Sequence, residues 1–153
     1  CKTTRRSTSG GVVLHGTHCI RHWSSTQTTI SLSSGEAELH GISTGMSQSL
    51  ALRSLFKDLG TQVKLRVHTD ATAAIGIARR LGIGKLRHLD CEDLWIQQKV
   101  RSKDITLLKV LGSENPADIF TKYVPQAILT AALKRLGMSQ ESGRPASAPA
   151  AAK

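Results

Sequence analysis

Hydrophobic and polar positions alternate with a period of two in three short stretches of the chain. Residues 10–14 and 17–23 alternate on either side of Gly16, which is the pattern of a β-hairpin that turns at this glycine. Residues 64–69 alternate again, and residues 105–110 form the nearly continuous apolar run of a buried strand. The pattern therefore predicts an antiparallel hairpin near the start and two further strands later in the chain.

Between these predicted strands, apolar residues recur with the spacing of an α-helix. Apolar residues recur every three or four positions from Leu39 to Leu59, which predicts a long helix. Ser33 and Glu36 form a capping box at its start, and Gly60 is placed to end it. Residues 28–32 suit either a short strand or an extended lead into this helix. Further helices are predicted from Asp70 to about Leu81, over residues 89–101, from Asn115 and Pro116 onward, and over residues 128–136.

The order of the predicted elements indicates an α/β fold. A hairpin followed by alternating helices and strands predicts a mixed β-sheet flanked by helices. A length of 153 residues suits one domain, which we expect over residues 1–137. Residues 138–153 are rich in Ser, Ala, Gly and Pro and lack an apolar pattern, so we expect a disordered tail there.

Charge adds a prediction about partners. Lys and Arg number 21 against 11 Asp and Glu, and the net charge of +10 favours a nucleic-acid partner. Because only 3% of residues are aromatic, contact with a duplex backbone is favoured over stacking on single strands. No apolar run is long enough to span a bilayer, so no membrane partner is expected. Three widely spaced cysteines indicate a reducing, intracellular compartment.

Three acidic residues stand near the ends of predicted elements. Glu38 lies one turn into the long helix, Asp70 lies between a strand and a helix, and Asp118 follows Asn115 and Pro116. Strand ends and helix starts gather at one rim of an α/β sheet, and carboxylate oxygens suit hard divalent cations. Each residue also has a structural interpretation: Asp70 as a helix cap, Asp118 as a complement to the helix dipole, and Glu38 as a solvated helix residue.

Several segments, in a fixed order, carry a resemblance to a known family. They are RSTSG at residues 6–10, WSS at 23–25, LSSGEAEL at 32–39, HTD at 68–70, RHLD at 87–90 and NPADIFTK at 115–122. In this order they resemble the ribonuclease H region of copia-like retrotransposon Pol polyproteins. The resemblance runs from Arg6 to about Gly137.

The resemblance implies both a fold and an activity. It implies a five-stranded mixed sheet with helices on both faces, and metal-dependent hydrolysis of RNA in RNA–DNA hybrids beside the reverse transcriptase domain of the same polyprotein. Glu38, Asp70 and Asp118 match three catalytic carboxylates that hold two Mg²⁺ or Mn²⁺ ions. The family's first strand and its aspartate precede the RSTSG segment. We therefore expect this chain to be truncated at its N-terminus and to lack them, because no acidic residue precedes Glu36.

Two alternatives to an active nuclease stay open at this point. The first is a truncated, non-catalytic remnant that at most binds nucleic acid. The second is a zinc-dependent binding module, because His15, His18, Cys19 and His22 crowd into the hairpin and Cys1 is near in sequence.

A basic stretch follows the second predicted helix. Arg79, Arg80, Lys85 and Arg87 surround a glycine-rich bend. These four residues are candidates for contact with nucleic-acid phosphates, and a solvated loop is the alternative interpretation.

Overall fold

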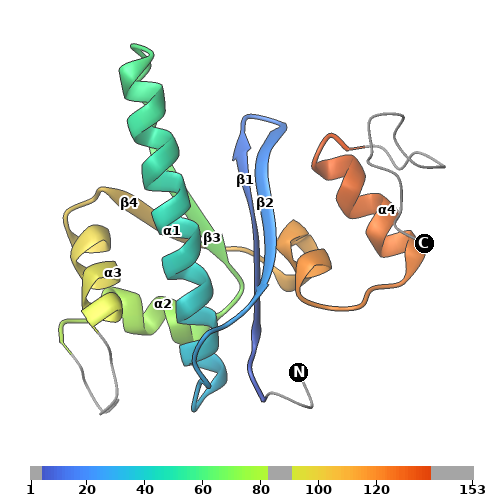
Figure 1. Ribbon diagram of the computed structural model, residues 1–153, viewed down its shortest axis with the longest axis horizontal. Helices are drawn as coiled ribbons and strands as arrows, with labels where there is room; N and C mark the ends of the chain where they lie inside the picture. Colours follow the sequence, from blue (N-terminus) through green and yellow to red (C-terminus); the bar gives the residue numbers. More distant parts are fainter. Residues whose placement is uncertain (1–4, 83–90, 139–153) are drawn as a thin grey trace, which may run out of the picture.

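The computed structural model describes residues 5–82 and 91–138, except for the side chains of residues 91–93. The order of elements in these residues follows the prediction (Figure 1). The elements are β1 (Thr8–His15), β2 (His18–Thr26), α1 (Ser34–Asp58), β3 (Leu65–Thr69), α2 (Thr72–Arg79), α3 (Cys91–Arg101), β4 (Ile105–Lys109), the 3₁₀ segments η1 (Gly112–Glu114) and η2 (Pro116–Phe120), and α4 (Gln126–Arg135).

The predicted hairpin is confirmed. β1 and β2 pair antiparallel from Thr8 opposite Thr26 to His15 opposite His18. Gly16 in the turn has a φ of 61°, a left-handed conformation that costs glycine little because it has no Cβ. The local alternation of the sequence was therefore enough to place both strands and the turn.

The long helix begins at the predicted cap, although Glu36 bonds to the amide before the N-cap residue Ser33 instead of to that of Ser33 itself. The Ser33 hydroxyl accepts a hydrogen bond from the Glu36 amide at 3.2 Å, and the Glu36 carboxylate accepts one from the Leu32 amide at 2.7 Å. Residues 28–32 form no strand and lead into α1 with bends at residues 28, 29 and 32. At the far end Gly60, with a φ of 79°, donates to the Lys57 carbonyl. The cap at Ser33 fixes the start of α1 and so places Glu38 in the first turns of the helix.

The buried core lies on one side of the molecule. β3 and β4 are parallel, and helices α1, α2 and α3 pack around them (Figure 1). The hairpin contributes no residue to this core, which consists of Leu39, Ile42, Met46, Ala74, Ile75, Ile77, Ala78, Ile96, Ile105 and Leu107. The hairpin instead stands between α1 and the segment that contains η2 and α4 (Figure 1).

The predicted α/β class is confirmed, with a break in the sheet. Within the described residues the strands form two separate two-stranded sheets, β1–β2 and β3–β4. The break lies between β1 and β3, whose facing edges do not pair with each other. The expectation of a missing first strand stays a prediction.

The last elements differ in detail from the prediction. Asn115 caps as expected, because its side-chain oxygen accepts from the Ala117 amide at 3.2 Å, but the segment that follows is a short 3₁₀ turn rather than an α-helix. It packs against β1 so closely that a Cβ on Gly10 would lie 2.7 Å from the Phe120 Cβ. The final helix starts at Gln126, two residues earlier than predicted.

The predicted C-terminal tail and the expected absence of a membrane-spanning helix can be compared with the described residues. The predicted tail lies outside the described residues, apart from Met138. Among the described helices, none combines the length and the apolar character that crossing a bilayer requires.

Candidate active site

Glu38, Asp70 and Asp118 line one cleft of about 380 Å³. They reach it from three separate places: the first turns of α1, the residue after β3, and η2. The other lining residues include hydroxyl-bearing residues and one lysine: Ser7, Thr8, Ser9, Ser34, Thr121 and Lys122. The fold therefore gathers three acidic side chains that are far apart in the sequence.

A buried glutamine fixes the start of α1 against β1. The side-chain amide of Gln27 donates to the Ser9 hydroxyl at 2.8 Å and to the Ala37 carbonyl at 2.7 Å. The Ser31 hydroxyl donates to the Gln27 side-chain oxygen at 3.0 Å. These bonds hold the residue before Glu38 against the first strand, so Gln27 is a positioning residue that no sequence pattern singled out.

Asp70 has no capping role in the structure. α2 starts at Thr72 with Ala71 as its N-cap, and no side chain caps it. The helix-cap interpretation of Asp70 is therefore wrong. Gly112 leaves room beside the carboxylate, since a Cβ there would lie 3.3 Å from the Asp70 Oδ2.

Asp118 is paired with a lysine that the sequence analysis missed. The Lys122 Nζ lies 2.9 Å from the Asp118 Oδ2, and the two residues are four apart in the chain. That spacing between an acid and a base is a recognisable sequence signal for a local ion pair. The ammonium group brings one positive charge to the carboxylate cleft.

The charged groups influence one another across the cleft. The pKa of Glu38 is raised, chiefly because the surrounding protein limits hydration of its carboxylate, and next because Asp70 repels the negative charge. The positive charge of Lys122 lowers this pKa, and repulsion from Asp118 raises it slightly further. The pKa of Lys122 is raised mainly by its hydrogen bond to Asp118 and further by the field of all three carboxylates, while partial burial opposes the rise. The cleft is therefore an electrostatically coupled site.

The oxygen donors have the right chemistry for a hard divalent cation, but their spacing is too open. Among the side chains that the structure describes, no three from His, Cys, Asp or Glu lie close enough to hold one metal ion. The residues present therefore do not fit a bound ion as they stand. The same finding leaves the histidines and Cys19 of the hairpin without a zinc site in the described residues.

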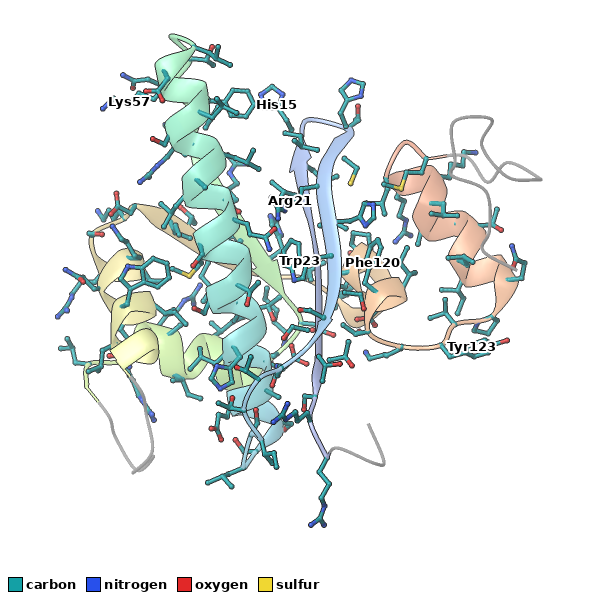
Figure 2. The ribbon with its side chains drawn as sticks, viewed as in Figure 1. His15, Arg21, Trp23, Lys57, Phe120 and Tyr123 are labelled. Carbon is teal, nitrogen blue, oxygen red and sulfur yellow. The ribbon has the colours of Figure 1, made fainter. Side chains whose placement is uncertain are left out.

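Two of the hairpin histidines make structural contacts instead. The His15 ring stacks on Phe56 of α1 at 5.0 Å, and the His22 ring stacks on Phe120 of η2 at 5.2 Å (Figure 2). The Ser24 hydroxyl also donates to the Phe120 carbonyl at 2.6 Å. These contacts hold the hairpin to α1 on one side and to η2 on the other.

The predicted phosphate-binding residues lie away from the cleft or outside the described residues. The Arg79 guanidinium donates to the Leu107 carbonyl at 2.8 Å and so joins α2 to β4. Neither Arg79 nor Arg80 lines the cleft. Lys85 and Arg87 lie outside the described residues. A role for these four residues in nucleic-acid binding stays a prediction.

Comparison with known proteins supports the resemblance at a coarser level. The chain is 28% identical over 124 residues to the retrovirus-related Pol polyprotein from transposon TNT 1-94 of Nicotiana tabacum. It resembles a region of a transposon Pol polyprotein. The match covers 80% of this chain, which spans about 9% of that relative's length. No family model and no solved structure matches. The similarity supports an origin in a retrotransposon polyprotein.

Proposed function

We propose that this chain belongs to the ribonuclease H region of a copia-type retrotransposon polyprotein and supplies three carboxylates for hydrolysis of RNA in RNA–DNA hybrids. The observation that carries the proposal is the shared cleft of Glu38, Asp70 and Asp118, in which repulsion contributes to the raised pKa of Glu38. Three carboxylates from distant segments repel one another, and a perturbed group in a cleft marks a candidate functional site.

The residues of this chain have distinct parts in that proposal. The net charge of +10 attracts the hybrid, and the hydroxyl groups along the cleft are suited to hydrogen-bond phosphate and ribose oxygens. Lys122 offsets part of the negative charge that faces the phosphate. Mg²⁺ or Mn²⁺, two ions by resemblance, and the reverse transcriptase domain are the proposed cofactors and partner. The carboxylates do not close around an ion as they stand.

The test is a hybrid-cleavage assay with Mg²⁺ or Mn²⁺. The assay compares this chain with a longer form that includes the polyprotein sequence upstream of it. In the form that cleaves, Asp70→Asn should abolish cleavage and leave hybrid binding nearly unchanged, because it removes a carboxylate and no phosphate contact. Asp58→Asn, at the exposed end of α1, is the matched control and should retain cleavage. Equal turnover by wild type and Asp70→Asn refutes the catalytic role.

The alternative is a non-catalytic remnant that binds nucleic acid. The open spacing of the carboxylates favours it, because no three acidic, His or Cys side chains among the described residues lie close enough to hold one ion. Hybrid binding without cleavage by either form of the chain establishes this alternative and rejects the nuclease.

A further inference from the structure

One basic side chain shares the cleft with the three carboxylates. Among the described residues that line the cleft, Lys122 carries the only full positive charge. Its Nζ lies 2.9 Å from the Asp118 Oδ2, and the two residues are four apart in the chain. When Glu38, Asp70 and Asp118 are ionised, one positive charge faces three negative charges. The lysine therefore neutralises the cleft only in part.

The backbone after Pro116 keeps the lysine close to its partner. The amides of Thr121 and Lys122 both donate to the Asp118 carbonyl, at 3.1 and 3.0 Å. The Thr121 hydroxyl donates to the same carbonyl at 3.3 Å. These bonds close one turn of the chain, so the Cα of Lys122 stays near Asp118 whichever way its ammonium group points.

The two partners differ in their exposure to water. The Lys122 side chain is 61% exposed, whereas the Asp118 side chain is 26% exposed. Exposed charge pairs contribute little to stability, because water solvates the separated groups and a long side chain loses freedom when it is held. The ammonium group can therefore leave Asp118 for water or another anion while the packing of η2 stays as it is.

The ammonium group acts on the whole cleft and not on Asp118 alone. The pKa of Lys122 is raised first by its hydrogen bond to Asp118, and the negative charges of Asp118, Asp70 and Glu38 add to the rise, against the effect of partial burial. Attraction and repulsion between charges extend over several ångströms in such a site. A second cation that approaches the carboxylates therefore also meets the charge of Lys122.

The carboxylates and the lysine together explain why the cleft does not fit a divalent cation. No three acidic, His or Cys side chains among the described residues lie close enough to hold one ion. In addition, the Asp118 Oδ2, an oxygen suited to a hard cation, already accepts a hydrogen bond from Lys122. The cation of the folded cleft is thus an ammonium group of the chain itself.

We propose that Lys122 is an internal counter-ion that competes with divalent cations for the cleft. A divalent cation binds tightly there only after the ammonium group has left Asp118. A nucleic-acid phosphate is suited to draw the ammonium group away, because it offers a charged hydrogen-bond acceptor on the exposed side. The consequence that substrate opens the cleft to cations rests on the proposed function. The competition between lysine and cation is independent of it.

The test measures Mn²⁺ binding by the full chain. Calorimetry gives the affinity, and paramagnetic broadening of the Glu38, Asp70 and Asp118 amide signals in NMR shows whether the ion lies in the cleft. We expect Lys122→Met to bind Mn²⁺ about tenfold more tightly than wild type, because the substitution removes a nearby repulsive charge and keeps the length of the side chain. Lys122→Arg should bind like wild type, since it keeps the charge.

Lys57→Met is the matched control, because it removes the same charge elsewhere. Lys57 is exposed in the last turn of α1, at the opposite end of that helix from Glu38 (Figure 2). The two residues are roughly 28 Å apart along the helix axis, at about 1.5 Å per residue. We expect its affinity for Mn²⁺ to stay within about twofold of wild type, because salt at about 0.1 M screens charges beyond about 10 Å.

A second measurement follows the lysine itself and needs no variant. Addition of Mg²⁺ to the wild-type chain should move the NMR signal of the Lys122 Cε toward that of a solvated lysine, in step with the amide shifts of Asp118. The Lys57 Cε signal should stay unchanged. Shifts of the Asp118 amide while the Lys122 signal stays in place contradict the competition.

Other outcomes also overturn the proposal. Equal Mn²⁺ affinities of wild type and Lys122→Met reduce the lysine to a local ion pair, and an equal gain by Lys57→Met assigns the effect to net charge. Absence of Mn²⁺ from the cleft in every variant rejects both the competition and metal-dependent cleavage. Tighter Mn²⁺ binding by Lys122→Met without hybrid cleavage by either form of the chain keeps the counter-ion and rejects the nuclease. Cleavage together with equal affinities does the reverse.

Discussion

The carboxyl group of Glu38 binds its proton more tightly in the folded chain than in the unfolded one. Its pKa is raised by limited hydration and by Asp70, against the opposing effect of Lys122. Because the folded pKa is higher than the ordinary value of 4.5, folding becomes less favourable as pH rises from 4.5 to the folded pKa. Above the folded pKa the free energy of unfolding falls no further from this cause. The ionised Glu38 therefore opposes folding at neutral pH.

Glu38→Gln removes that charge and should stabilise the fold at neutral pH. We expect a gain of about 0.5 kcal/mol, kept small because the side chain is partly exposed and solvent screens its charge. The gain should vanish below pH 4.5, where the wild-type carboxyl is protonated too. Urea unfolding at both pH values measures it. Glu114→Gln, at an exposed position of η1, is the control. An equal gain in the free energy of unfolding by this control, or an equal gain by Glu38→Gln below pH 4.5, contradicts the explanation.

At the scale of elements, the hairpin is attached to the rest of the fold mainly through polar and aromatic contacts. It supplies none of the core residues, and the side chain of Gln27 joins β1 to the start of α1. The two attached groups are the hydroxyl of the buried Ser9 and the carbonyl of Ala37. The attachment determines where Glu38 stands relative to β1.

Gln27→Leu should therefore loosen β1 from α1. We expect a loss of about 1–3 kcal/mol in the free energy of unfolding, because the substitution leaves buried polar groups without partners. Gln62→Leu, in the exposed loop before β3, is the control and should change stability little. Urea unfolding compares the two variants, and equal losses show that the Gln27 bonds contribute nothing special.

At the scale of the whole molecule, a basic chain holds an acidic cleft. The net charge is +10, while three of the 11 acidic residues meet in one place. We expect the net positive charge to attract a polyanion and the carboxylates of the cleft to oppose that attraction locally. Affinity and chemistry are therefore expected to depend on different residues.

Affinity for an RNA–DNA hybrid should fall steeply with salt. We expect at least about a tenfold loss between about 50 and about 200 mM salt, because binding releases the counterions of the phosphates. A DNA duplex of equal length should show a similar slope, since backbone contact carries no sequence information. Fluorescence anisotropy measures both affinities. Affinity that is insensitive to salt contradicts electrostatic binding.

The sequence alone determined the features that depend on near neighbours. Period-two alternation and Gly16 placed the hairpin, and the hydroxyl of Ser33 with Glu36 placed the start of α1, because turns and caps are built within a few residues. The position of acidic residues at element ends also made Glu38, Asp70 and Asp118 candidates before any fold was known.

The tertiary structure decided what depends on contacts between distant segments. It gathered the three carboxylates in one cleft and placed the side chain of Gln27 between β1 and α1. It also turned the segment after Pro116 into a 3₁₀ element packed on Gly10 and left β1 and β3 apart. Sequence patterns report which face of an element is buried, whereas the partner of that face is set by packing across the whole chain.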